Sequence, residues 1–345
     1  MNNVAVTGGI VPLTMSNLEA ETINNPDEKA CPFVTLSLTK KCPFRCLYCG
    51  EGGEGTISNM LEFSHDWFRE VVDSSVFCGV KKIRFTGGEP LVYKNIDNSA
   101  KYVLDSGITL LINTNGLFVN RFIKAIGNYK KNLHIAVSLD SLKEKTFDKM
   151  SSTRGLFQRV IDNIIMLKEL GLLLRINMVV TQLNVKEVPG MVNFCCSKGI
   201  NLKLQEVVCV PIPFGSWPSL HVPLESLDLF LEGQADEVFV HSYSRSHGVP
   251  VKVYRIGSIL VTNKSLAGGS HYDVDGVCKK CPHYPCHEGL YDLYVLPDRR
   301  VAVCRWHTLG DGDILKTLDE GKKIFMRSSY VKRHLMPMCA KGKNA

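Results

Sequence analysis

Short apolar runs alternate with amphipathic stretches through the first two thirds of the chain. Residues 173–180 are rich in branched apolar side chains, as in a buried strand, whereas residues 156–170 repeat their apolar positions at a helical period. The predicted strands are 33–38, 82–85, 109–112, 134–138, 173–180 and 202–208, and the predicted helices are 65–76, 96–106, 156–170 and 186–198. This order predicts about six parallel βα units in an α/β fold.

Polar and glycine-rich residues follow several of these strands, and in a βα barrel the carboxyl ends of the strands form the functional face. Prolines crowd the chain just after residue 210 and indicate a boundary. We therefore expect an N-terminal extension at 1–30, a βα domain at 31–210 and a cysteine-rich region at 211–345. In that last region, 290–304 is predicted to form a hairpin and 315–334 a helix.

The composition is that of an ordinary soluble protein, with 45% apolar and 22% charged residues. The formal net charge of +7 weakly favours an anionic partner. No signal peptide opens the sequence, and no run of about 18 apolar residues predicts a membrane span. Thirteen cysteines without an export signal favour the reducing cytoplasm and metal ligation.

Three cysteines stand close together after the first predicted strand. Cys42, Cys46 and Cys49 have the spacing C-x3-C-x2-C, which suits three corners of a cubane [4Fe–4S] cluster. One iron is then left open to a small molecule, and in this spacing that molecule is S-adenosylmethionine. The alternatives are unrelated thiols or a zinc site, although structural zinc prefers four ligands and no histidine lies near in sequence.

The run Thr86-Gly87-Gly88-Glu89-Pro90 is the second strong signal, and it follows the strand at 82–85. Glycines at a strand end let a ligand approach the backbone closely. Glu89 adds a carboxylate that can accept a hydrogen bond from an ammonium group. We expect Gly87, Gly88 and Glu89 to bind the methionine part of S-adenosylmethionine, with a plain βα turn as the alternative.

Weaker signals follow two later strands. Small polar residues at a strand end can bind ribose or carboxylate groups, but they also cap turns. The candidates of this kind are Thr114, Asn115, Ser138 and Asp140.

Two arginines lie within apolar strands, where a charge is costly unless it is paired. If Arg84 and Arg175 point into the barrel, they are candidate catalytic residues that bind an anionic substrate. If they point outward, they are surface charges.

Four late cysteines, Cys278, Cys281, Cys286 and Cys304, have the spacing C-x2-C-x4-C-x17-C. Such a set binds zinc or an iron–sulfur cluster. Because a first cluster is already predicted, a second, auxiliary [4Fe–4S] cluster is the favoured interpretation.

These motifs together resemble the radical S-adenosylmethionine superfamily, in which Tyr48 would stand before the last cysteine of the hallmark triplet. More narrowly, residues 33–208 resemble molybdenum cofactor biosynthesis protein A, the GTP 3′,8-cyclase, and its relatives. The resemblance implies a partial (β/α)6 TIM-like barrel and a radical cluster on the cysteine triplet. It also implies that Tyr48, Gly88 and Ser138 lie around S-adenosylmethionine, that Arg84 and Thr114 face the substrate, and that Arg175 replaces a phosphate-binding lysine.

The chain departs from the cyclase in its arginines and in its late cysteines. No FGR-type element precedes the first cysteines, and Pro282-His283-Tyr284 stands where the cyclase has an arginine-rich run. The late cysteines resemble the auxiliary-cluster extensions (SPASM or twitch type) of radical tailoring enzymes. These departures predict a C-terminal cysteine-rich auxiliary-cluster extension and a substrate other than GTP.

The leading hypothesis is therefore a radical S-adenosylmethionine enzyme that forms a new bond in a nucleotide, a sugar nucleotide or a peptide. The alternatives are GTP 3′,8-cyclase itself and a non-catalytic zinc or iron–sulfur binding protein. Besides its small-molecule or peptide substrate, the enzyme would need an external electron donor such as flavodoxin or ferredoxin. Neither a membrane nor nucleic acid is an expected partner.

Overall fold

The computed structural model describes residues 33–49, 61–208, 217–241, 251–270, 292–304 and 307–311. Six parallel strands pair in chain order, as the sequence predicts. They are β1 (Phe33–Thr39), β2 (Lys82–Gly87), β3 (Thr109–Thr114), β4 (Leu133–Ser138), β5 (Leu173–Val180) and β6 (Leu202–Glu206). The predicted α/β architecture, a partial (β/α)6 barrel, is confirmed.

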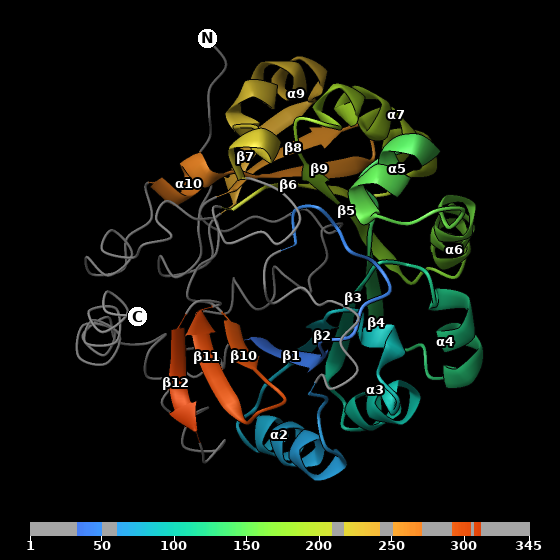
Figure 1. Ribbon diagram of the computed structural model, residues 1–345, viewed down its shortest axis with the longest axis vertical. Helices are drawn as coiled ribbons and strands as arrows, with labels where there is room; N and C mark the ends of the chain where they lie inside the picture. The colour runs from blue at the N-terminus through green and yellow to red at the C-terminus, as the bar shows by residue number, and fades with distance from the viewer. Residues whose placement is uncertain are drawn as a thin grey trace.

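Helices connect these strands and cover the convex side of the curved sheet (Figure 1). They are α2 (His65–Phe77), α3 (Ile96–Asp105), α4 (Val119–Ile126), α5 (Glu144–Ser151), α6 (Phe157–Glu169) and α7 (Val188–Lys198). The four predicted helices correspond to α2, α3, α6 and α7. The helices α4 and α5 were not predicted, because eight residues give little more than two turns of apolar periodicity.

The sheet has an apolar outer face and a polar inner face. Phe85 of β2 packs against Phe68 of α2, with ring centroids 5.9 Å apart, so this side of the strand faces the helices. Successive side chains of a strand point to opposite sides, and Arg84 therefore faces the inside of the barrel. Outer residues such as Leu36 and Ile112 are fully buried, and each contributes about 1.5–3 kcal/mol to stability.

Strands from the C-terminal part of the chain continue the same sheet at both edges. β9 (Ile259–Lys264) pairs parallel with β6, and β10 (Asp292–Val295) pairs parallel with β1. The antiparallel strands beyond them are β8 (Val251–Ile256) and β7 (Glu237–His241) on one side, and β11 (Arg300–Cys304) and β12 (His307–Asp311) on the other. The result is a 12-stranded arc (Figure 1), and the predicted hairpin is confirmed as β10 and β11.

Three short helices complete the described part: α8 (Trp217–Leu220), α9 (Asp228–Gln234) and α10 (Leu266–Ser270). Strands from both sides of residue 210 share one sheet, and the division of the chain into three regions stays a prediction. The N-terminal extension and the predicted helix at 315–334 lie outside the described residues. Among the described helices, none has the length and apolar character needed to cross a bilayer.

Two glycines bring the end of β2 against the chain that follows β1. The Gly88 N–H donates to the Thr39 carbonyl, and the Glu89 N–H donates to the Lys41 carbonyl, both at 2.8 Å. A Cβ on Gly87 would lie 2.3 Å from the Thr39 oxygen, and one on Gly88 would lie 2.3 Å from the Lys41 oxygen. These two positions therefore exclude any side chain.

The substitution Gly88→Ala should lower the free energy of unfolding by about 1–3 kcal/mol, because the added methyl group overpacks the contact with Lys41. Gly190→Ala in α7 is the matched control, since nothing lies within 4 Å of its Cβ position. Alanine favours a helix over glycine, so the control should be unchanged or more stable. Urea denaturation measures both variants, and equal stability of the two would contradict the packing role of Gly88.

Candidate functional site

Residues 40–49 form the loop that carries the first three cysteines, and we call it the cysteine loop. It leaves the carboxyl end of β1 and runs toward α5 (Figure 1). The Arg45 N–H donates to the Ser151 carbonyl at 3.0 Å, and the Leu47 N–H donates to the Met150 carbonyl at 2.9 Å. The cysteine loop is thus fixed to β2 at its start and to the end of α5 in its middle.

The three thiols of this loop are partly buried. The Asn115 side-chain amide approaches the Cys42 sulfur at 3.9 Å, and the Cys49 N–H donates to the Cys46 carbonyl at 3.0 Å. Burial raises the pKa of the Cys46 thiol, and the nearby Asp140 carboxylate raises it further. Because metal binding requires the thiolate, ligation here would release protons.

This donor set fits a cubane cluster with three protein ligands. Within the described residues, no three His, Cys, Asp or Glu side chains converge on a position for one metal ion. A cubane does not need such convergence, since each iron takes a single thiolate. Thiolates are also the soft ligands that iron–sulfur clusters prefer.

The GGEP and NTNG runs meet at the carboxylate of Glu89, which is fully buried. Its Oε1 accepts from the Thr114 hydroxyl at 2.7 Å and from the Leu91 N–H at 2.9 Å, and its Oε2 accepts from the Asn115 N–H at 2.7 Å. Burial raises the pKa of Glu89 to about 7. This side chain therefore ties the end of β2 to the end of β3.

The sequence analysis expected Gly87, Gly88 and Glu89 to bind the methionine part of S-adenosylmethionine, but these residues already contact other parts of the protein. The space beside Gly87, where a ligand was expected to approach, is filled by the backbone of Thr39 at the end of β1, and the space beside Gly88 is filled by the backbone of Lys41 in the cysteine loop. Glu89 already accepts three hydrogen bonds from the protein. Direct binding of an ammonium group by these residues stays a prediction.

Tyr48 and Asp140 form a second tie. The Tyr48 hydroxyl donates to Asp140 Oδ2 at 2.6 Å, and Asp140 Oδ1 accepts from the Val179 N–H at 2.8 Å. Burial raises the pKa of Asp140 to about 6 and also raises the pKa of Tyr48. The buried amide of Asn184 donates to the carbonyls of Asp140 and Val179 at 2.7 and 2.8 Å. The cysteine loop is thereby joined to the ends of β4 and β5.

Arg84 and Arg175 both face the inside of the barrel, so neither is an outward surface charge. Arg175 is 3% exposed, alternates with the core residue Ile176, and donates from Nε to Asn177 Oδ1 at 2.9 Å. Ser138 pairs in register with Asn177 and shares this inner face. Contact of these residues with a substrate or cofactor stays a prediction.

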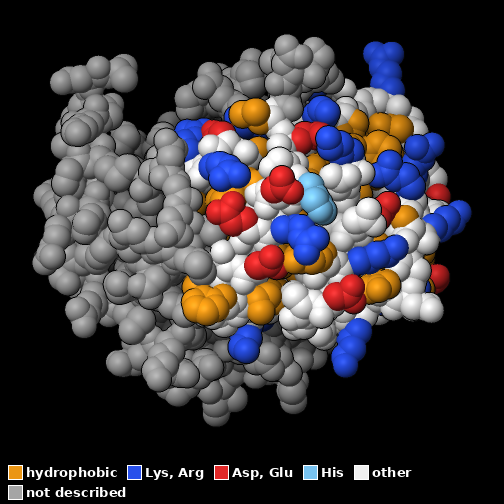
Figure 2. Space-filling view, turned by 90° about the horizontal axis from the view of Figure 1, so that it is seen from below, with side chains coloured by type: hydrophobic (Ala, Val, Ile, Leu, Met, Phe, Trp, Pro, Cys, Tyr) orange, Lys and Arg blue, Asp and Glu red, His pale blue; other side chains and the backbone are white. Residues whose placement is uncertain are grey.

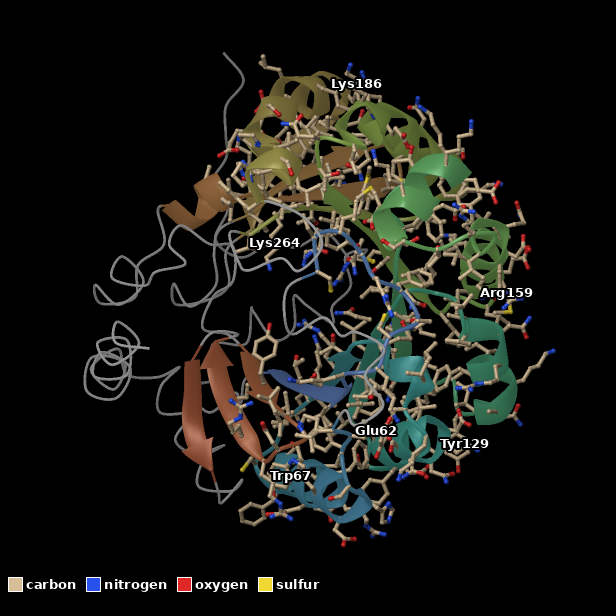
Figure 3. All side chains as sticks on the ribbon, viewed as in Figure 1. Glu62, Trp67, Tyr129, Arg159, Lys186 and Lys264 are labelled. Atoms are coloured by element: carbon tan, nitrogen blue, oxygen red, sulfur yellow. The ribbon has the colours of Figure 1, made fainter. Side chains whose placement is uncertain are left out.

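More basic residues share the inner face, although the sequence analysis did not single them out. Lys203 of β6 pairs in register with Asn177, and Lys264 of β9 pairs with Gln205. Figure 3 shows Lys264 in the space that the strands enclose. On β1–β6 and β9 the inner-face basic residues are Lys82, Arg84, His134, Arg175, Lys203 and Lys264.

The inner-face positions of β1–β6 and β9 differ in charge from those of the outer strands, where Asp292 of β10 and Glu237 of β7 are acidic. Burial and the neighbouring Lys82 charge lower the pKa of His134, which favours its neutral form. No Asp or Glu occupies an inner-face position of β1–β6 or β9. Strand alternation would have revealed Lys82 and Lys203 from the sequence. Lys264 carried no such signal, because its strand joins β6 from far along the chain.

The late cysteines are only partly placed. Cys278, Cys281 and Cys286 lie outside the described residues, as does the glycine-rich run at 50–55. Cys304 ends β11, which is separated from β1 by β10 alone. The auxiliary cluster stays a prediction.

Comparison with known proteins finds a matching family profile and similar individual proteins. The Radical SAM superfamily profile matches residues 36–195. A GTP 3′,8-cyclase of Nautilia profundicola is 29% identical over 187 residues, which cover 52% of this chain and 57% of that protein. A GTP 3′,8-cyclase of Rhizobium etli is 28% identical over 238 residues, which cover 68% of this chain and 67% of that protein. The chain thus spans little more than half the length of the first of these relatives.

Two solved structures share the fold. SuiB of Streptococcus suis bound to S-adenosylmethionine has a TM-score of 0.57 at 16% identity, covering 80% of this chain and 61% of SuiB. The protein anSMEcpe with bound AdoMet has a TM-score of 0.57 at 15% identity, covering 85% of this chain and 83% of that one. Such low identities establish the fold alone. The profile match, together with the cysteine loop at the end of β1, shows that residues 36–195 belong to the radical S-adenosylmethionine superfamily.

Proposed function

We propose that this chain is a radical S-adenosylmethionine enzyme that removes a hydrogen atom from an anionic organic substrate and forms a new bond in it. One observation carries the proposal: the cysteine loop lies at the carboxyl end of a barrel whose inner face is basic. When bound, a [4Fe–4S] cluster on Cys42, Cys46 and Cys49 together with S-adenosylmethionine supplies a 5′-deoxyadenosyl radical.

The protein's own residues would hold S-adenosylmethionine near the strand ends. Asn115 lies beside the Cys42 sulfur, and Ser138 lies at the inner end of β4. The ties through Glu89 and Asp140 keep these strand ends at a fixed distance from the cysteine loop. We therefore assign the ends of β2, β3 and β4 to the cofactor site. Gly87, Gly88, Thr114 and Tyr48 lie at or beside these strand ends, and we assign them to the same site.

An anionic substrate fits the inner face. A hydrogen bond to a charged group contributes about 1.5–3 kcal/mol, and Arg84, Arg175, Lys203 and Lys264 supply cationic donors on one surface. Nucleotides, sugar nucleotides and acidic peptides all carry the matching charge. A peptide is a candidate because SuiB, which shares the fold, has been crystallised bound to the precursor peptide SuiA.

We further propose that the late cysteines hold a second cluster. Cys304 lies on β11, and only β10 separates that strand from β1, which leads into the cysteine loop. The other three cysteines stand 18, 23 and 26 residues before Cys304 in the sequence. A cluster built there would lie on the β1 side of the arc.

Iron content tests the two-cluster proposal. After anaerobic reconstitution we expect about eight irons per chain, because each cubane holds about four. Changing Cys42, Cys46 and Cys49 together to alanine should leave about four. The control Cys196→Ser, in α7, should keep the full content. Stoichiometric zinc that persists after reconstitution, with a single cubane of iron, would show that the late group is a zinc site.

Cleavage of S-adenosylmethionine by the reduced protein tests the proposed radical chemistry. Reduced, reconstituted protein should slowly convert S-adenosylmethionine to 5′-deoxyadenosine and methionine without substrate, because an open iron binds it. Cys46→Ala should abolish the reaction, whereas the control Cys78→Ser, at the end of α2, should retain it. Liquid chromatography measures both products. A fully loaded, reduced protein that never yields 5′-deoxyadenosine would favour the non-catalytic alternative.

The second candidate function is GTP 3′,8-cyclase, which the matched relatives favour by name. We expect GTP to bind poorly and not to be cyclised, because Pro282-His283-Tyr284 replaces the arginine-rich run of the cyclase. Losing two or three charge-assisted contacts weakens binding by roughly two or more powers of ten. Incubation with GTP, S-adenosylmethionine and reductant tests this, and efficient formation of 3′,8-cyclo-GTP would make the cyclase interpretation correct.

A further inference from the structure

A basic hollow opens at the surface beside the cysteine loop. Its volume is about 700 Å³, and its cationic lining residues, Lys145, Lys149 and Arg154, are all exposed. Asp148, which is half-buried, is the single carboxylate among the lining residues. The full lining is Lys145, Asp148, Lys149, Ser152, Thr153 and Arg154. The hollow therefore has a net positive charge.

This surface is physically continuous with the cysteine loop. Arg45 is exposed and stands between Cys42 and Cys46 in the cysteine loop. Its backbone N–H donates to the carbonyl of Ser151, which is next in sequence to the lining residue Ser152. The buried Phe44 ring packs edge-on against Phe147 of α5 at 5.9 Å. A partner seated over the end of α5 would thus touch the cysteine loop from outside the barrel.

The lysines of this hollow differ from other exposed lysines near the loop. Lys41 forms an ion pair with Glu62 at 3.3 Å, and Lys143 forms one with Glu187 at 3.7 Å. Within the described residues, Lys145, Lys149 and Arg154 form no ion pair. On the face shown in Figure 2, by contrast with the hollow, Lys and Arg side chains are interspersed with Asp and Glu side chains. The charge on α5 is thus left available to an outside partner.

The inference rests on the proposed function, because a radical S-adenosylmethionine enzyme requires an outside partner that delivers electrons. Each reductive cleavage of S-adenosylmethionine consumes one electron, which an external carrier must deliver to the cluster. The inner face is assigned to substrate, so the carrier must approach the loop from outside. We propose that the surface formed by Arg45, Lys145, Lys149 and Arg154 is the docking site of an acidic one-electron carrier protein.

Charge reversal at this surface tests the docking site. In the double variant Lys145→Glu/Lys149→Glu, reduction of the reconstituted protein by reduced flavodoxin should slow by at least about tenfold at low ionic strength, because electrostatic steering is lost. Added salt should shrink the difference, since the Debye length falls from about 30 Å at 0.01 M to about 10 Å at 0.1 M. Reduced methyl viologen, a cation, should reduce the variant as fast as the unchanged protein or faster.

The matched control is Lys124→Glu/Lys131→Glu, which makes the same change in net charge. These lysines lie at the end of α4 and just before β4, at the opposite end of the barrel from the cysteine loop. The flavodoxin rate of this control should stay close to that of the unchanged protein.

Three results would overturn the inference in different ways. Equal slowing of both double variants would show an effect of net charge without a docking site. Loss of S-adenosylmethionine cleavage in the α5 variant with methyl viologen would assign the surface to the substrate or to cluster assembly. No cleavage by the unchanged protein with methyl viologen would overturn the proposed function, and the docking site with it.

Discussion

The site depends on the backbone contact between the end of β2 and the start of the cysteine loop. Gly87 and Gly88 let two main chains approach more closely than any side chain would allow, and two hydrogen bonds at 2.8 Å fix that approach. Further along, Tyr48 and the end of α5 hold the rest of the loop. The protein's own contacts thereby hold in place the loop that carries the three thiols.

Two buried carboxyl groups extend this positioning across the sheet. Glu89 joins the ends of β2 and β3, and Asp140 joins the cysteine loop to the ends of β4 and β5. Burial raises both pKa values, to about 7 and about 6, while the hydrogen bonds favour the ionised form. A carboxyl group suits this role because its two oxygens can accept from two segments of chain at once.

Local periodicity was enough to predict β1–β6 and the longer helices. The metal-binding role that cysteine spacing predicts for the cysteine loop stays a prediction. The sequence left the direction of Arg84 open, and the packing of its neighbour Phe85 on α2 shows that Arg84 faces the inside of the barrel. The sequence could not reveal that β9 joins β6 and that β10 joins β1, because strands far apart in sequence carry no local sign of their pairing. For the same reason Lys264 was missed, and Glu89 was assigned a ligand before its protein partners were known.

The central claim is that the cysteine loop holds a cluster with an iron open to S-adenosylmethionine. Electron paramagnetic resonance of the reduced protein tests it most directly, with the late cysteines changed to alanine so that only the loop cluster contributes. The amino and carboxylate groups of S-adenosylmethionine should bind the open iron and change the spectrum of the cluster. A spectrum that stays the same at saturating S-adenosylmethionine would contradict the account.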